Sequence, residues 1–566
     1  MSGNAAIQYQ KDGFHTSGPR LMGRHAAGEG FLKGFARHAD VERFYCYAAD
    51  RPTYDDFEHR IATFAGTPRP CHWIPARRPH DLSVPGMLFR SDPGVAEMAW
   101  LRRHGDSRAH GLCGITHTIA SAGVMDALGA LAVAPVQPWD ALICTSEAVR
   151  AAVEHVLENW CAYLEERVGA RPEIPLQRPV IPLGVDCAAL ADSPASRAAR
   201  AGLRQRLKIA DDDVVALYMG RLSFHAKTHP LPMYLGLEEA ARQTGNRVHL
   251  ILAGWFANDS IRDEFQAAAR AFCPSVNVVH LDGRDPAVRA QVWFAADLFT
   301  SLSDNIQETF GLVPIEAMAA GLPMVVSDWD GYRDTVRHGI DGFAVPTRMP
   351  APGLGADLAR RFHAEIDSYD RYIGHVSQTT SVGVAATAEA FTALVGQPDL
   401  RRRMAEAGRA RAREIYDWRV VIGAYQALWR DLAERRQSET EHTPRAAAAP
   451  AHPLRDDPYA LYAGYATAPI GGGDWVELAP GAGPDRLSRL RVHDMNSFAT
   501  QVLAGDGDAE AVLRHLDTRG RCTVDRLLSS FAPEKRTTVH RTIGWLAKMG
   551  LVRLPGKAAE PDEGAG

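Results

Sequence analysis

The sequence predicts an α/β protein with parallel, doubly wound sheets and a small, mainly helical module at its C-terminus. Three observations lead to this prediction. Strand-like and helix-like segments alternate along the first two thirds of the chain. Residues 214–219 are entirely apolar, which is typical of a strand buried on both faces of a parallel sheet. The tail, residues 523–554, changes to two helix-like segments around a short turn.

Composition places the chain among ordinary globular proteins. It has 566 residues, enough for about three or four domains, with 46% hydrophobic and 23% charged residues. The formal net charge of −5 gives no global basic field for nucleic acid. The eight cysteines are scattered without a CxxC pair, which indicates buried thiols in a reducing cytosol. With no signal peptide at the N-terminus, we expect a cytoplasmic protein, peripheral to the inner membrane face if its acceptor is a lipid.

In the first half, short apolar segments alternate with helical ones. Residues 86–89, 112–116 and 141–144 are expected to be strands, and residues 95–103 an amphipathic helix. The polar run Thr-Ser-Glu at 145–147 is a typical helix N-cap and predicts a long helix from residue 148. No clear strand is expected before the Gly-rich segment 14–33, which we interpret as a loop followed by a helix start.

The second half contains the segment around which the chain is organised. Strands are expected at 214–219, 248–253, 276–280 and 298–302. Residues 308–331 then read as loop, helix and strand, with Glu308 in the loop and Glu316 in a helix that ends at Gly321. A helix N-terminus that follows a parallel strand offers free N–H groups to a phosphate, and the two carboxylates are suited to accept hydrogen bonds from sugar hydroxyls.

These residues resemble the retaining GT-B glycosyltransferases of family 4. The resemblance rests on two motifs, Gly-Arg-Leu…Lys and the Glu…Glu segment, formed by Gly220, Arg221, Leu222 and Lys227 and by Glu308, Phe310, Gly311, Glu316, Ala317 and Gly321. It implies two Rossmann-like domains that face each other across a cleft. It also implies transfer of a sugar, with retention and without a metal, from a nucleotide-sugar donor to an acceptor hydroxyl.

The resemblance assigns roles to individual residues. Glu308 is expected to touch the donor sugar, with His117 beside it at the C-terminal end of a strand. Donor binding is assigned to Arg221, Lys227, Thr309, Phe310, Gly311, Leu312 and Glu316, where Arg221 and Lys227 neutralise the diphosphate and Glu316 holds the ribose. Gly28, Glu29 and Gly30 are candidates for a loop over the cleft.

Domain boundaries follow from the same family resemblance and from composition. We expect an N-terminal Rossmann-like, acceptor-side domain at 1–185 and a C-terminal Rossmann-like, nucleotide-sugar-binding domain at 186–437, whose last helix crosses back to the first. Residues 438–457 are polar and rich in Pro and Ala, which predicts a linker. Residues 458–566 form an extension with a winged-helix-like module.

The tail carries nine basic against four acidic residues between 510 and 555, a surplus of +5. Specific DNA binding is one interpretation, and contact with a protein partner is the one we favour. Other functions left open are a GT-B nucleotide-sugar epimerase, a phosphorylase, and a DNA-binding regulator that senses sugar nucleotides. The Asp-Trp-Asp sequence at 328–330 matches a metal-binding pattern of another glycosyltransferase fold, but we predict neither a metal nor any other cofactor.

Overall fold

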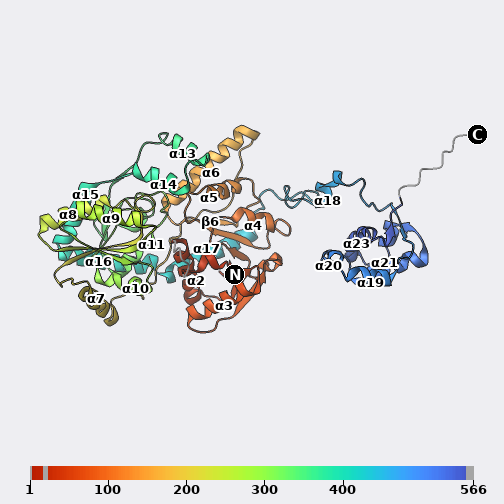
Figure 1. The fold of residues 1–566 in the computed structure, drawn as a ribbon, viewed down its shortest axis with the longest axis horizontal. Helices are drawn as coiled ribbons and strands as arrows, with labels where there is room; N and C mark the ends of the chain where they lie inside the picture. Colours follow the sequence, from red (N-terminus) through yellow and green to blue (C-terminus); the bar gives the residue numbers. More distant parts are fainter. Residues whose placement is uncertain (1–2, 17–22, 556–566) are drawn as a thin grey trace, which may run out of the picture. The chain divides into compact units, whose positions relative to one another are not determined.

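A computed structural model describes residues 3–16 and 23–555 (Figure 1). The chain divides into two compact units, Met1–His452 and Pro453–Gly566. The larger unit contains two six-stranded sheets, and the pairs of neighbouring strands in both sheets are parallel. The predicted α/β class with two Rossmann-like domains is therefore confirmed, and a helical module follows them.

The first sheet has the strand order β3-β2-β1-β4-β5-β6, which reverses direction between β1 and β4 as in dinucleotide-binding sheets. Its strands are β1 (Ala6–Gln8), β2 (Phe44–Ala48), β3 (Cys71–Pro75), β4 (Met87–Phe89), β5 (Gly111–Ile115) and β6 (Ala141–Ile143). A strand does precede the Gly-rich segment, so the expectation of none was wrong. The three-residue strand β1 is too short for its apolar pattern to stand out in the sequence.

Helices cover this sheet: α1 (Lys11–Phe14), α2 (Gly23–His38), α3 (Arg51–Ala65), α4 (Val95–Arg102), α5 (Ala122–Gly129) and α6 (Glu147–Val168), with short 3-10 turns at η1 (Pro79–Ser83) and η2 (Ala130–Ala132). The helix predicted after the polar run at 145–147 is α6. Ser146 caps it, because its Oγ accepts a hydrogen bond from the Val149 N–H at 3.2 Å.

The second sheet repeats the topology of the first, with the order β12-β11-β10-β7-β8-β9. Its strands are β7 (Val214–Leu222), β8 (Val248–Phe256), β9 (Asn277–Asp282), β10 (Leu298–Ser301), β11 (Met324–Ser327) and β12 (Gly342–Val345). The central strands β7, β10 and β11 are buried on both faces, as their apolar sequences predict. Because all strands run parallel, the loops that carry the predicted donor residues follow their carboxyl ends.

The helices of this half are α7 (Pro194–Arg206), α8 (Leu231–Thr244), α9 (Asp259–Phe272), α10 (Pro286–Ala295), α11 (Leu312–Ala320), α12 (Tyr332–Thr335), α13 (Ala356–His363), α14 (Tyr369–Gln378), α15 (Val384–Gly396) and α16 (Pro398–Arg411). A two-stranded antiparallel ribbon, β13 (Thr347–Arg348) and β14 (Ser381–Val382), lies outside the main sheet.

Residues 400–437 have one long helical pattern in the sequence, but the structure divides them in two. After α16 comes a π-helical segment, η3 (Ala412–Tyr416), and then α17 (Trp418–Ser438). The break is at Asp417, whose backbone is extended and whose side chain accepts a hydrogen bond from the Arg419 N–H at 2.9 Å, so that it caps a new helix. Helix α17 crosses back and packs beside α2 of the first half (Figure 1).

The smaller unit is mainly helical. Its elements are α18 (Pro458–Leu461), η4 (Ala463–Tyr465), β15 (Trp475–Leu478), α19 (Pro484–Arg491), α20 (Asp494–Ser497), α21 (Asp506–Arg519), β16 (Cys522–Thr523), α22 (Val524–Leu528), η5 (Pro533–Lys535), α23 (Arg536–Lys548) and β17 (Val552–Arg553). The strands form an antiparallel sheet in the order β16-β15-β17. The core contains Leu527, Val539, Ile543 and Leu546, the apolar positions from which the helices were predicted.

Candidate active site

The loop after β7 brings two cations to the carboxyl edge of the second sheet. Arg221, near the end of β7, donates hydrogen bonds to the Ala226 carbonyl at 2.7 Å and to Gln307 Oε1 at 3.4 Å. The Lys227 ammonium forms an ion pair with the Glu308 carboxylate. The structure therefore brings Arg221, Lys227 and Glu308 into one cluster, although 81 residues separate Lys227 from Glu308 in the sequence.

Tyr332 is the second group that contacts the Glu308 carboxylate, after Lys227. Its hydroxyl donates to Glu308 Oε2 at 3.4 Å, and the same hydroxyl lies 2.8 Å from Ser301 Oγ. Burial and the nearby Glu308 charge raise the Tyr332 pKa well above its ordinary value, so the hydroxyl stays protonated. The Glu308 side chain is only 12% exposed. Its carboxylate is thus fixed by one cation and one neutral donor.

Helix α11 begins at Leu312, in the stretch that follows Glu308, and requires glycine at its N-cap. Gly311 has φ +82°, and a Cβ at this position would lie 2.2 Å from Cε1 of Tyr332. No side chain caps this helix end. Phe310 is buried below it, and Leu312 is the first helical residue. The N-terminus of α11 therefore presents uncapped N–H groups beside Lys227 and Glu308, an arrangement suited to an anion.

Glu316 lies on α11, one turn beyond this N-terminus, and its side chain is half-buried. Burial raises its pKa to about 7, and the Arg289 charge opposes this shift only partly. Hydrogen bonds from the hydroxyl groups of a ligand would stabilise the charged form of a carboxylate in such surroundings. This placement fits the predicted contact with a ribose.

The Asp-Trp-Asp segment runs beside the Glu308 loop. The Trp329 indole N–H donates to the Asn305 carbonyl at 3.1 Å, and Asp328 lies 3.5 Å from Arg333. Asp330 has a left-handed backbone, with φ +51°, and burial raises its pKa well above 3.8. Among the residues that the structure describes, no group of three or more His, Cys, Asp or Glu side chains is arranged to hold a metal ion.

His117 lies just beyond the carboxyl end of β5, in the first half of the larger unit. Burial lowers its pKa to about 4, so the imidazole is neutral at pH 7. The next residue, Thr118, reaches the second half of the unit, where its hydroxyl lies 3.3 Å from that of Tyr369. The groups that act on His117 itself, Ser91, Arg24 and Asp92, belong to the first half.

Gly28, Glu29 and Gly30 do not form a loop. They lie inside α2, where two of them allow close packing of backbones and rings. A Cβ on Gly28 would lie 2.1 Å from the Gly13 carbonyl oxygen, and one on Gly30 would lie 3.0 Å from Trp418 Cζ2. Glu29 is paired with Arg60 at 3.3 Å. The glycines that suggested a loop over the cleft are thus packing positions.

Several site residues were not found from the sequence. Tyr332, Gln307 and Asn305 contact the predicted residues, yet each is a common residue type in a loop or short helix. The sequence pattern did single out Ser146, in the polar run at 145–147, but only as a helix cap. Its hydroxyl also reaches the Glu308 loop, where it donates to the Thr309 carbonyl at 2.7 Å.

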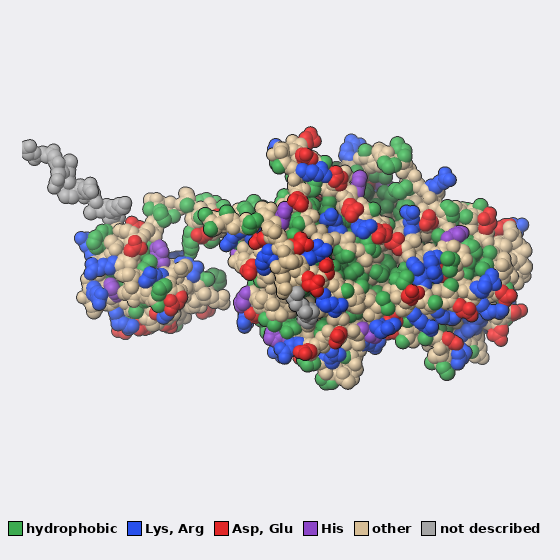
Figure 2. Space-filling view, turned by 180° about the vertical axis from the view of Figure 1, so that it is seen from behind, with side chains coloured by type: hydrophobic (Ala, Val, Ile, Leu, Met, Phe, Trp, Pro, Cys, Tyr) green, Lys and Arg blue, Asp and Glu red, His purple; other side chains and the backbone are tan. Residues whose placement is uncertain are grey.

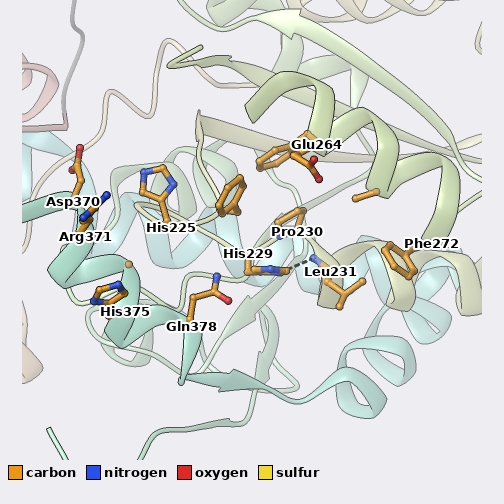
Figure 3. A pocket seen from close by; sticks show the side chains of 14 residues that line it. His225, His229, Pro230, Leu231, Glu264, Phe272, Asp370, Arg371, His375 and Gln378 are labelled. Atoms are coloured by element: carbon orange, nitrogen blue, oxygen red, sulfur yellow. Dashed lines mark hydrogen bonds between the residues drawn. The ribbon is translucent and has the colours of Figure 1, made fainter. Parts of the chain in front are cut away.

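A separate pocket of about 610 Å³ lies behind the loop that carries Lys227 (Figure 3). Its walls come from that loop and from helices α8, α9 and α14, and they include His225, His229, Phe265 and Phe272. Of the described residues that line it, none is among the predicted donor residues. The Asn305 amide donates to the His225 carbonyl at 2.9 Å, so the pocket wall is tied to the Glu308 loop.

The face of the larger unit that Figure 2 draws carries both signs of charge. On the face drawn in Figure 2, acidic and basic side chains are interspersed. None of the described helices has the length and apolar character needed to span a bilayer.

Residues 200–360 match the family model Glycosyl transferases group 1. The matched segment contains Arg221, Lys227, Glu308, Gly311 and Glu316. The match lies within the second Rossmann-like domain, and it contains every residue to which a donor-binding role was assigned.

Named relatives match part of the chain. Over 285 residues the chain is 32% identical to a D-inositol 3-phosphate glycosyltransferase of Geodermatophilus obscurus, an alignment that covers 47% of this chain and 57% of the relative. Over 172 residues it is 31% identical to a phosphatidyl-myo-inositol mannosyltransferase of Mycobacterium leprae, covering 30% and 36%. The chain thus spans about half the length, or less, of these curated relatives.

Solved structures of similar fold include the Anabaena protein HepE in complex with UDP. The alignment has a TM-score of 0.48 and 18% identity, and it covers 77% of this chain and 100% of that chain.

Proposed function

We propose that the protein is a retaining, metal-independent glycosyltransferase that moves a sugar from a nucleotide-sugar donor to an acceptor hydroxyl. The observation that carries this proposal is the cluster of Arg221, Lys227 and Glu308 beside the uncapped N-terminus of α11. It lies at the carboxyl edge of a parallel sheet, where ligands of such folds bind.

Each part of the cluster has a role in the proposed reaction. The leaving nucleoside diphosphate gains negative charge as the glycosidic bond breaks, and Arg221, Lys227 and the α11 N–H groups stabilise that charge. Fixed cations can do this without a metal ion. Glu308 contacts the sugar, oriented by Tyr332 and Lys227, and Glu316 accepts hydrogen bonds from the ribose hydroxyls.

Retention is proposed from the resemblance of the Glu308–Glu316 segment to the retaining family. In that chemistry the acceptor hydroxyl attacks from the face that the leaving phosphate vacates, and the phosphate takes its proton. No separate base is then required. The neutral His117 is proposed to contact the sugar from the opposite domain, as a hydrogen-bond partner that carries no charge.

The acceptor is proposed to be a hydroxyl of a saccharide, of a lipid-linked carrier or of a small molecule. Two relatives are named for inositol-containing substrates, which supports including D-inositol 3-phosphate and phosphatidylinositol among the candidates. The smaller unit is proposed to bind a protein partner rather than specific DNA.

The test is a panel of UDP- and GDP-sugars, each incubated with these acceptors and followed by mass spectrometry of the products. Wild-type protein should form one glycoside with retained anomeric configuration, and EDTA should leave the rate unchanged. Glu308→Gln should abolish transfer without unfolding, whereas the exposed control Asp328→Asn should retain it. Full turnover by Glu308→Gln, or loss of activity with EDTA that added metal restores, would refute the proposal.

A further inference from the structure

Two hydrogen bonds join the N-terminus of α6, in the first half of the larger unit, to the second half, one at the donor segment 308–311 and one at α12. Ser146 Oγ donates to the Thr309 carbonyl at 2.7 Å. The backbone N–H of Glu147 donates to Asp334 Oδ2, also at 2.7 Å. Ser146 is 1% exposed, so the first bond is shielded from water. Asp334 brings a negative charge to the positive end of α6, which strengthens the second bond.

A second contact between the halves lies near His117. Ala120, which follows β5, packs with Ala226 and Ile373 of the second half in a small buried cluster. Thr118 and Tyr369 face each other at its edge, with their hydroxyl oxygens 3.3 Å apart. The two halves are therefore in contact at Ala226, next to Lys227, and at Thr309, next to Glu308.

The chain crosses between the halves at a different place. Here the Val185 N–H donates to the Tyr416 carbonyl at 2.7 Å, and the Trp418 N–H donates to the Val185 carbonyl at 3.1 Å. These backbone bonds join the two crossing strands to each other. A rotation of the halves about this pair would break the Ser146 and Asp334 bonds and leave the crossing bonds intact.

We propose that Ser146 and Asp334 are positioning residues that fix the donor segment 308–311 when the two halves close. Thr309 lies between Glu308 and Gly311, so a bond to its carbonyl fixes both the direction of the Glu308 side chain and the start of α11. Because the donor of that bond comes from the other half, the geometry of the segment depends on closure. The inference rests on the proposed function and adds how that site is assembled.

Substitutions at Ser146 separate this role from helix capping. Ser146→Asp keeps an acceptor for the Val149 N–H but cannot donate to the Thr309 carbonyl. Ser146→Thr keeps both functions. Asp334→Ala removes the acceptor for the Glu147 N–H. The matched control is Asp328→Asn, in the turn between β11 and α12, which has no described contact to the first half.

Hydrogen exchange of the full chain, without ligand, tests the two hydrogen bonds themselves. Asp334→Ala should accelerate exchange of the Glu147 amide, and Ser146→Asp should accelerate exchange in segment 308–311, while Ser146→Thr and Asp328→Asn match wild type. Unchanged exchange in both Asp334→Ala and Ser146→Asp would overturn the inference. This readout does not depend on turnover, so it stands or falls separately from the proposed function.

Kinetics with the donor found in the panel test the consequence. Ser146→Asp and Asp334→Ala should each lower kcat by roughly tenfold, the effect of about one hydrogen bond, while UDP or GDP titration shows nucleotide affinity within about twofold of wild type. Ser146→Thr should restore kcat. If kcat is unchanged, or if nucleotide affinity falls as much as kcat, the positioning role is wrong. If wild type turns over no nucleotide sugar, the proposed function is wrong.

Discussion

Replacing Asp304 by Asn should alter the stability of the protein in a way that depends on pH. Asp304 follows β10 and is 3% exposed. Its carboxyl group accepts hydrogen bonds from Ser377 Oγ, at 2.9 Å, and from the backbone N–H of His229. These bonds connect α14 to the loop that carries Lys227. No cation is among the groups that act on it, and burial raises its pKa from 3.8 to about 7.

The magnitude follows from linkage between protonation and folding. A pKa that is raised from 3.8 to about 7 corresponds to about 4 kcal/mol. Below pH 3.8 the group is protonated in both the folded and the unfolded state, so it costs nothing. As the pH rises towards 7, the unfolded state loses its proton first, and the wild type loses stability. Asn carries no charge. Between pH 4 and pH 8.5 the free energy of unfolding of the variant should therefore rise relative to that of wild type by up to about 4 kcal/mol.

Urea and thermal unfolding of wild type and Asp304→Asn at several pH values measure this difference. Asn cannot accept both of the hydrogen bonds that the carboxyl accepts, which should cost the variant about 1 kcal/mol at every pH. The diagnostic is therefore how the difference in unfolding free energy between variant and wild type changes with pH, rather than its constant part. Asp212→Asn, at an exposed position, is the control and should show no slope. A difference between Asp304→Asn and wild type that stays constant from pH 4 to pH 8.5 would refute the reasoning.

Three further predictions concern the donor site, the core and the smaller unit. The Glu316 pKa is about 7, and the carboxylate is the form that accepts hydrogen bonds from a ribose. Donor affinity should therefore fall as the pH drops from 8 to 6, and Glu316→Gln should flatten that profile. An equally steep profile in the variant would contradict the ribose contact. Arg102 is 1% exposed and pairs with Asp140 at 2.6 Å. Asp140→Leu leaves this arginine buried and unpaired, so it should destabilise the larger unit by about 3–5 kcal/mol in urea unfolding. A cost below about 1 kcal/mol would show that the pair is dispensable. Deletion of residues 453–566 removes one whole compact unit, so UDP or GDP affinity in calorimetric titration should change by less than about twofold, and a larger loss would show that this unit supports the donor site.

The sequence predicted the second sheet more fully than the first. Residues 214–219, 248–253 and 324–327 are long or strongly apolar, and the structure has β7, β8 and β11 there. In contrast, β1 has three residues and α1 only four, and neither length allows a periodic pattern to develop. The divided helix at 412–417 was missed because the apolar spacing continues across the π-helical segment.

At the site, the sequence identified the residues whose chemistry is distinctive and whose spacing is local. Glu308, Gly311 and Glu316 lie within one loop and one helix, so their neighbourhood could be predicted. The ion pair of Lys227 with Glu308 was not predicted, because it depends on two loops that only the sheet order brings together. Tyr332 was missed for the same reason, since its contact with Glu308 joins α12, which follows β11, to the loop after β10.

The glycines of α2 lead to a last prediction, in which two effects of opposite sign compete. Gly34→Ala should gain up to about 1 kcal/mol from helix propensity. However, its Cβ would lie 2.9 Å from Trp418 Cγ and Cδ2, and overpacking of this kind typically costs about 1–3 kcal/mol. Trp418 is 5% exposed and is also close to Gly30 and Gly184, so its ring has little room to move.

The packing effect should therefore win, and Gly34→Ala should lower the unfolding midpoint of the larger unit. The matched control is Gly423→Ala in α17, which has no atom within 4 Å of the added Cβ and should raise the midpoint through propensity alone. Thermal unfolding of both variants under one condition decides the matter. If Gly34→Ala stabilises the protein as much as Gly423→Ala does, the crossing of α17 over α2 is looser than this contact requires, and the Gly-rich segment needs another explanation.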